Sequence, residues 1–275
     1  MQLSVGQLNM SRLFELADSA SKAILDIYGD ETRWHQVSKS DHTPVTAADI
    51  RSSEILVAGL PGVFDCPVVS EEDLPPYERR SQWPLYWLVD PLDGTKEFIG
   101  RTGEFVINIA LMHQNQPVFG FIYQVTENLA WWGGPEVGAY SGHLEKLSVG
   151  SVKPLDSQLG TTNESILALG SRRSNWKGEW RARLQACGYR VSTQSVGSAL
   201  KFAYLAEGHG DLYPRLGPTS EWDTAAPQAI LDATGGAVVQ WNGQPLEYGK
   251  KNTLNPHFVA VRDKAFLKVL LENTE

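Results

Sequence analysis

The order of the secondary-structure signals along the chain limits its fold more than any other feature. In residues 105–148, apolar runs alternate with turns that contain Gly, Asn or Pro, which predicts an antiparallel sheet of strands joined by hairpins. After about residue 150, short apolar runs alternate with helical segments, which is typical of a mixed α/β layer. We therefore expect an N-terminal α+β half, residues 1–152, and a C-terminal α/β half, residues 153–275, with the boundary within 150–162.

Periodicity gives the individual elements of each half. Two helices, at residues 13–27 and 46–60, and two short buried strands, at 67–69 and 85–89, precede the hairpin region. In the second half we expect strands at 166–169, 189–192, 211–213 and 237–240, and helices at 176–186, 198–206, 224–233 and 263–272.

Composition narrows the class of protein. The 275 residues carry a net charge of −8, so a broad nucleic-acid surface, which depends on many Lys and Arg contacts, is not expected. The two cysteines form no metal-binding pair, and no apolar stretch approaches about 18 residues, so we predict no transmembrane segment. We expect a cytoplasmic protein without a signal peptide, a monomer or homodimer, and leave open peripheral attachment to the cytoplasmic face of the inner membrane.

The segment 87–98 carries the strongest chemical signal. An apolar strand ends at Asp90, Pro91 makes a turn, and Asp93 follows three residues later. Two carboxylates without a neighbouring His or Cys suit magnesium rather than zinc. Gly94 begins a run of backbone N–H groups, at 94–96, that suits an anion. Taken alone, the same residues fit an ordinary Asp-Pro turn after a strand.

Three more acidic residues stand at the ends of predicted elements. Glu71 follows the strand at 67–69, Asp223 precedes a helix, and Asp49 is the third residue of the helix that Thr46 begins. Each has a purely structural alternative: a surface charge for Glu71, an N-cap for Asp223 and a capping box for Asp49. Their joint occurrence with Asp90 favours an active site.

Four motifs together resemble the inositol monophosphatase superfamily. Asp90-Pro-Leu-Asp-Gly-Thr95 is similar to its first signature, with Ser70-Glu-Glu upstream, and Trp222-Asp-Thr-Ala-Ala is similar to its second. Thr46-Ala-Ala-Asp49 resembles its N-terminal acidic motif. The motifs occur in the family's order, and the likeness spans about residues 39–236. The resemblance implies a layered αβαβα sugar-phosphatase fold.

The resemblance also implies roles for individual residues. Magnesium would be the cofactor, with two or more ions, and lithium would inhibit. The implied metal ligands are Glu71, Asp90, the Leu92 carbonyl, Asp93 and Asp223. Thr95 and Asp49 would form a proton relay to the attacking water. The implied contacts to the substrate are those of Glu71, Leu92, Asp93, Gly94, Thr95 and Asp223.

Other segments indicate a branch of the family. Residues 96–98, 197–202 and 206–215 resemble CysQ-like 3′(2′),5′-bisphosphate nucleotidases, which implies removal of the 3′-phosphate of adenosine 3′,5′-bisphosphate, and of its sulfated form, in sulfur metabolism. Lower-ranked candidates for nucleotide contacts are Lys96, Ser198, Lys201 and Arg215, although both lysines also fit surface positions. Pro227 departs from the Gly that many family members carry, and leaves local packing open.

Two other functions remain open. One is a phosphatase of the same superfamily that acts on inositol phosphates or other sugar phosphates. The other is a nucleotide or metal sensor without activity, against which the intact Asp49, Thr95 and metal-ligand set argues, because a sensor needs no water-activating pair.

Overall fold

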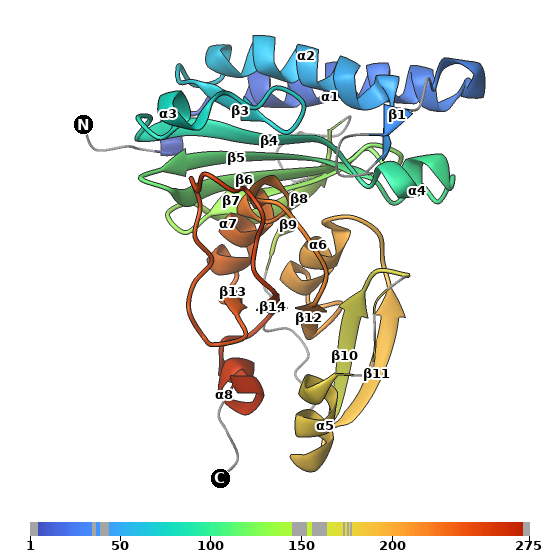
Figure 1. Ribbon diagram of the computed structural model, residues 1–275, viewed down its shortest axis with the longest axis vertical. Coiled ribbons are helices and arrows are strands. Elements are labelled where there is room, and N and C mark those ends of the chain that lie inside the picture. Colours follow the sequence, from blue (N-terminus) through green and yellow to red (C-terminus); the bar gives the residue numbers. More distant parts are fainter. Residues whose placement is uncertain are drawn as a thin grey trace.

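The protein is a stack of five layers (Figure 1). The computed structural model describes residues 5–34, 37–38, 44–144, 153–155, 164–172, 174, 176 and 178–271. Helices α1 and α2 cover one face of the first sheet, α6 and α7 lie between the two sheets, and α5 and α8 cover the outer face of the second sheet. The predicted αβαβα arrangement is confirmed.

The outer helix layer follows from an apolar stripe and two caps. α1 (Met10–Tyr28) buries Leu13, Ala17 and Ile24 against the first sheet, and the Asn9 side chain accepts the Arg12 N–H at its start. α2 (Ala47–Gly59) begins with the predicted capping box, formed by Thr46 and the helix's third residue.

The first sheet has seven strands in the order β3-β4-β5-β6-β7-β8-β9. Its strands are β3 (Val68–Ser70), β4 (Leu85–Asp93), β5 (Val106–His113), β6 (Gln116–Gln124), β7 (Leu129–Gly134), β8 (Gly138–His143) and β9 (Lys153–Pro154). β3 runs parallel to β4, and every later pair is antiparallel, so the predicted hairpin region is confirmed. Shorter elements attached to this half are β1 (Val37–Ser38), β2 (Pro44–Val45), α3 (Tyr77–Arg80) and α4 (Thr95–Ile99).

The central helices are α6 (Leu200–Ala206) and α7 (Ala225–Ala233). α7 lies directly on β6, where a Cβ added at Gly120 would stand 2.0 Å from the Ala226 carbonyl oxygen. Pro227 falls in the first turn of α7, where no intrahelical N–H bond is lost. The predicted start of α6 at residue 198 is wrong, because Ser198 adopts a left-handed backbone, with φ 44°.

The second sheet has five strands in the order β11-β10-β12-β14-β13. They are β10 (Ser165–Gly170), β11 (Arg190–Ser195), β12 (Leu212–Arg215), β13 (Ala237–Gln240) and β14 (Phe258–Val261). β10 pairs in parallel with β11 and with β12, whereas β14 pairs antiparallel with β12 and with β13. Its outer helices are α5 (Glu179–Ala186) and α8 (Ala265–Leu271). α5 begins three residues later than predicted, because Gly178 is extended.

The predicted division between residues 152 and 153 stays a prediction, since 145–152 and 156–163 lie outside the described residues. Within the described part of the chain, no helix combines the length and apolar character that crossing a membrane requires.

Candidate active site

Three carboxylates from two segments distant in sequence meet where β4 contacts a short 3₁₀ helix. Asp90 and Asp93 lie at the end of β4, and Asp223 ends a short 3₁₀ helix, Glu221–Asp223. One carboxylate oxygen of each lies within 4.8 Å of the other two. Asp90 is buried, with 2% of its surface exposed.

An irregularity in the first sheet brings Asp90 and Asp93 together. Side chains three residues apart on a regular strand point to opposite faces. Here Asp90 pairs with Asn108 and Asp93 pairs with Val106, so β4 uses one residue more than β5 between those pairs. This bulge turns both carboxylates toward one centre.

Hydrogen bonds fix the turn that carries the two aspartates. The Leu92 N–H donates to Asp90 Oδ1 at 3.1 Å, and the Ser52 hydroxyl of α2 donates to the Pro91 carbonyl at 2.8 Å. Gly94 follows in the left-handed conformation, with φ 104°, and is the N-cap of α4. The left-handed turn explains the glycine, because other residues are strained there.

Burial and mutual repulsion disfavour the ionised forms of the three carboxylates. Burial, and then the neighbouring negative charges of Glu71, Asp93 and Asp223, raise the pKa of Asp90 well above its ordinary value. Burial raises the pKa of Asp93 to about 6, although Lys201 opposes the shift. Burial, followed by the charges of Asp93 and Glu71, raises the pKa of Asp223 to about 7. An all-oxygen site whose charges repel one another fits a divalent cation such as magnesium.

Glu71 lies beside the cluster rather than inside it. The Glu71 N–H donates to the Val89 carbonyl at 3.1 Å, which places the residue just past the end of β3. Glu71 lines the same cavity as Asp93 and Asp223.

Asp223 is not the N-cap of α7. Its Oδ2 accepts the Ser220 N–H at 2.8 Å in a capping box of the preceding 3₁₀ helix, while Thr224 is the N-cap residue of α7. The N-cap alternative for Asp223 is therefore wrong, and the capping-box alternative for Asp49 is correct without excluding another role.

Asp49 and Thr95 are directly linked. The Thr95 hydroxyl donates to Asp49 Oδ1 at 3.0 Å. Asp49 Oδ2 accepts the Thr46 hydroxyl at 2.6 Å and the Thr46 N–H at 2.8 Å. Asp49 is 3% exposed, and burial raises its pKa, with the Thr46 and Thr95 hydrogen bonds opposing. The predicted pair thus forms one hydrogen-bonded unit.

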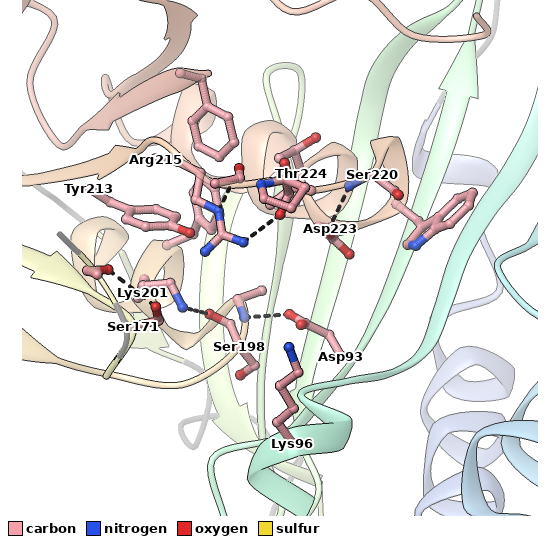
Figure 2. Close-up of a pocket in the computed structure, with 18 of the residues that line it drawn as sticks. Asp93, Lys96, Ser171, Ser198, Lys201, Tyr213, Arg215, Ser220, Asp223 and Thr224 are labelled. Carbon is pink, nitrogen blue, oxygen red and sulfur yellow. Dashed lines mark hydrogen bonds between the residues drawn. The ribbon is translucent and has the colours of Figure 1, made fainter. Parts of the chain in front are cut away.

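A cavity of about 1210 Å³ extends from the carboxylates. The acidic residues of its wall are Glu71, Asp93, Glu97 and Asp223, and the rest of the wall carries basic, hydroxyl and apolar side chains. The basic and hydroxyl side chains of the wall include Lys96, Ser171, Arg172, Ser174, Ser198, Lys201 and Arg215. We call the cavity bipolar because Asp93 and Asp223 lie at one end of it and Lys201 and Arg215 at the other, with Lys96 beside Asp93 (Figure 2).

Lys201 and Arg215 fix the shape of the cationic end. Lys201 Nζ donates to the Val196 carbonyl at 3.2 Å and to the Ser198 carbonyl, and lies 5.1 Å from the ring centre of Tyr213. Lys201 is only 4% exposed, so the surface alternative for it is wrong. Arg215 donates to the carbonyls of the turn that follows it, at residues 217 and 218.

Lys96 is exposed and stands at the acidic end of the cavity. Its side chain points from α4 toward the Asp93 carboxylate (Figure 2). The cation thus lies near the acidic cluster, unlike the buried Lys201.

Several neighbours of the site were not predicted. Ser52 and Ser53 lie three and four residues after Asp49 on α2, and Ser53 shares a 2.8 Å hydrogen bond with Ser70. Their helical spacing from Asp49 was a usable signal. Asn108 donates to Asp93 Oδ2 at 3.3 Å, and Arg172 reaches the cavity from the end of β10; neither stands in a motif that indicates its role.

Comparison with known proteins agrees with this geometry. The model of the inositol monophosphatase family matches residues 9–274. The chain is 41% identical over 251 residues to the 3′(2′),5′-bisphosphate nucleotidase CysQ of Escherichia coli K12, covering 90% of this chain and 98% of the relative. It is 35% identical to CysQ of Haemophilus influenzae, covering 96% of each chain.

Solved structures share the fold. The crystal structure of CysQ from Bacteroides thetaiotaomicron superposes with a TM-score of 0.77 at 35% identity, covering 93% of this chain and 97% of the other. The suhB protein of Bartonella henselae gives 0.75 at 21% identity, with 97% and 99% covered, and supports the fold alone. Because the family model matches nearly the whole of this chain, the chain belongs to the inositol monophosphatase family.

Proposed function

We propose that the protein is a magnesium-dependent 3′(2′),5′-bisphosphate nucleotidase. The observation that carries the proposal is the bipolar cavity, in which an acidic cluster faces a group of cations. A substrate with two phosphates matches both ends: the reacting phosphate lies at the carboxylates with magnesium, and the second phosphate lies at Lys201 and Arg215. The similarity to the curated nucleotidases supports the same substrate class.

The carboxylates are the proposed metal site. Glu71, Asp90 and the Leu92 carbonyl would hold one magnesium ion, and Asp90, Asp93 and Asp223 a second. Bound magnesium supplies charge neutralisation for the phosphoryl group and acidifies water. Members of the family are magnesium-dependent in general, and the number of ions is part of the proposal.

Thr95 and Asp49 are the proposed proton acceptors. The Thr95 hydroxyl, held by Asp49 Oδ1, orients the attacking water, and Asp49 takes the proton. Threonine alone is too weak a base, whereas burial raises the pKa of Asp49 and so makes it a better acceptor. Backbone N–H groups of Gly94 and Thr95 would hold the phosphoryl oxygens during in-line attack.

The remote end supplies binding energy for the reaction. Ser198, Lys201 and Arg215 are the proposed contacts to the 5′-phosphate, and Lys96 is a proposed substrate contact beside the carboxylates. Interactions with a non-reacting group orient the substrate and support catalysis at the 3′ position. We also propose a cytoplasmic monomer or homodimer; the thiols of Cys66 and Cys187, both unpaired, suit a reducing compartment.

A substrate panel tests the proposal. We expect kcat/KM for adenosine 3′,5′-bisphosphate to exceed that for inositol 1-phosphate and for AMP at fixed magnesium. A preference for inositol 1-phosphate would move the protein to the sugar-phosphatase alternative. No phosphate release from any of the three would favour the sensor.

A further inference from the structure

One oxygen of Glu104 joins two separate segments of the C-terminal half. Glu104 precedes β5, and its Oε2 accepts the Gly197 N–H at 2.6 Å. The same oxygen lies 2.8 Å from Nη1 of Arg172. Because Arg172 follows β10 and Gly197 follows β11, a single carboxylate from the N-terminal half fixes the ends of two neighbouring parallel strands.

The turn after Gly197 is held at a second point. Two residues later, the Ala199 N–H donates to Asp93 Oδ2 at 2.6 Å. Ser198 lies between these two anchors in a left-handed backbone conformation, which is costly for a residue with a side chain and persists only under outside constraint. The two carboxylates, Glu104 and Asp93, supply that constraint.

The contact at Gly197 is close. A Cβ added there would stand 2.7 Å from the Glu104 Cβ and 2.7 Å from the Glu97 Cγ. The backbone of the turn therefore approaches these acidic side chains as only glycine allows, which explains why Gly197 N–H reaches the carboxylate.

The ion pair with Glu104 positions the Arg172 side chain. This side chain is 44% exposed, and it lines the same cavity as Ser198 and Arg215. Glu104 lies behind the wall rather than on it. Glu97 Oε1 also lies 4.0 Å from the same Nη1, so two carboxylates neutralise part of the guanidinium. The planar group still lines the cavity, and such a group suits bidentate binding of a phosphate.

We propose that Arg172 binds the second phosphate of the substrate, and that Glu104 is a positioning residue that sets Arg172 and the Ser198 turn against it. The inference rests on the proposed function, because it assigns residues to the remote-phosphate end of that site. Neither residue belongs to the carboxylate cluster of the proposed metal site.

Two substrates with the same reacting group separate this role from a general structural one. Adenosine 3′,5′-bisphosphate carries the second phosphate, and adenosine 3′-monophosphate does not. Glu104→Gln should lower kcat/KM for the bisphosphate by about 10- to 100-fold, the effect of losing a charged hydrogen-bond partner. It should leave kcat/KM for the monophosphate within about twofold.

Arg172→Gln gives an independent arm, because we expect a substitution of this exposed side chain to leave folding intact. We expect the same loss of preference, and a double variant no worse than the more affected single, since the two residues act as one unit. Glu136→Gln, which removes the same charge in the exposed β7–β8 turn, is the matched control and should keep the preference.

Each outcome decides between the claims. An equal fall on both substrates, or an unchanged preference in Glu104→Gln, overturns the positioning role, and a retained preference in Arg172→Gln overturns phosphate binding by Arg172. If Glu104→Gln fails to fold, Glu104→Asp replaces it, because the shorter side chain keeps the charge but withdraws the carboxylate from Arg172 and Gly197; an unchanged preference in that variant overturns the positioning role. A wild-type protein with no preference for the bisphosphate overturns the proposed function and this inference with it.

Discussion

Replacing Asp223 by asparagine is expected to stabilise the metal-free protein at pH 8 while removing its activity. Burial beside Asp93 and Glu71 raises the pKa of Asp223 from 3.8 to about 7. A group with a raised folded-state pKa contributes stability below its ordinary pKa, and that stability is lost as the pH rises through about 7. In the wild-type protein, the Ser220 N–H donates to Asp223 Oδ2 at 2.8 Å. Asparagine removes the charge, and its amide oxygen can still accept this hydrogen bond.

The size of the effect follows from the pKa difference. A change from 3.8 to about 7 corresponds to about 4 kcal/mol of unfolding free energy. The shift comes first from burial and then from charges shared with the neighbouring carboxylates, and the cavity admits water, so we expect half of that, about 2 kcal/mol. For a chain of this size the gain is about 4–8 °C in Tm.

Thermal unfolding in chelator at pH 5, 6.5 and 8 measures this gain in Tm. Wild-type Tm should fall from pH 5 to 8, Asp223→Asn should fall less, and exposed Asp65→Asn should follow wild type. Magnesium should raise the wild-type Tm more than that of Asp223→Asn, because it binds the native site. A Tm for Asp223→Asn at or below wild type at pH 8 would refute the electrostatic reasoning.

Three further outcomes are expected. Thr95→Ala and Asp49→Asn should each lower kcat by about 10²–10⁴-fold, with a double variant little worse than either, because the pair acts as a unit; multiplicative losses would contradict the relay. Asp90→Asn should lower activity more than any other single change at the site, because Asp90 is the proposed ligand of both magnesium ions. Near-normal phosphate release in saturating magnesium would contradict that role. Gly120→Ala should destabilise the fold by about 1–3 kcal/mol in urea unfolding, since the new Cβ meets the Ala226 carbonyl, and an unchanged midpoint would contradict the packing of α7 on β6.

Much of the fold was predictable because periodicity reports burial locally. The helical stripe of α1, the hairpins of β5 to β8 and the α/β alternation after residue 164 each follow from neighbouring residues. The predicted starts of α5 and α6 were wrong, because Gly178 has an extended backbone and contacts distant in sequence hold the Ser198 backbone in the left-handed region. The strand β14 was missed.

The acidic residues were predictable because each stands in a local motif at the end of an element. How they meet was not, since the bulge between Asp90 and Asp93 depends on the register with β5. Lys201 was left between a nucleotide contact and a surface position, and only tertiary packing shows that it is buried. Glu104 and Arg172 carry no motif, and their contact joins residues 68 positions apart.

The identity of the mononucleotide product tests the central claim most directly. Adenosine 3′,5′-bisphosphate is incubated with the enzyme and magnesium, with a chelator blank, and the product is identified by ³¹P NMR. With the 3′-phosphate at the carboxylates and the 5′-phosphate at the cationic end, the product should be adenosine 5′-monophosphate, formed only in the presence of magnesium. Release of adenosine 3′-monophosphate, or equal product formation in chelator, would contradict the account.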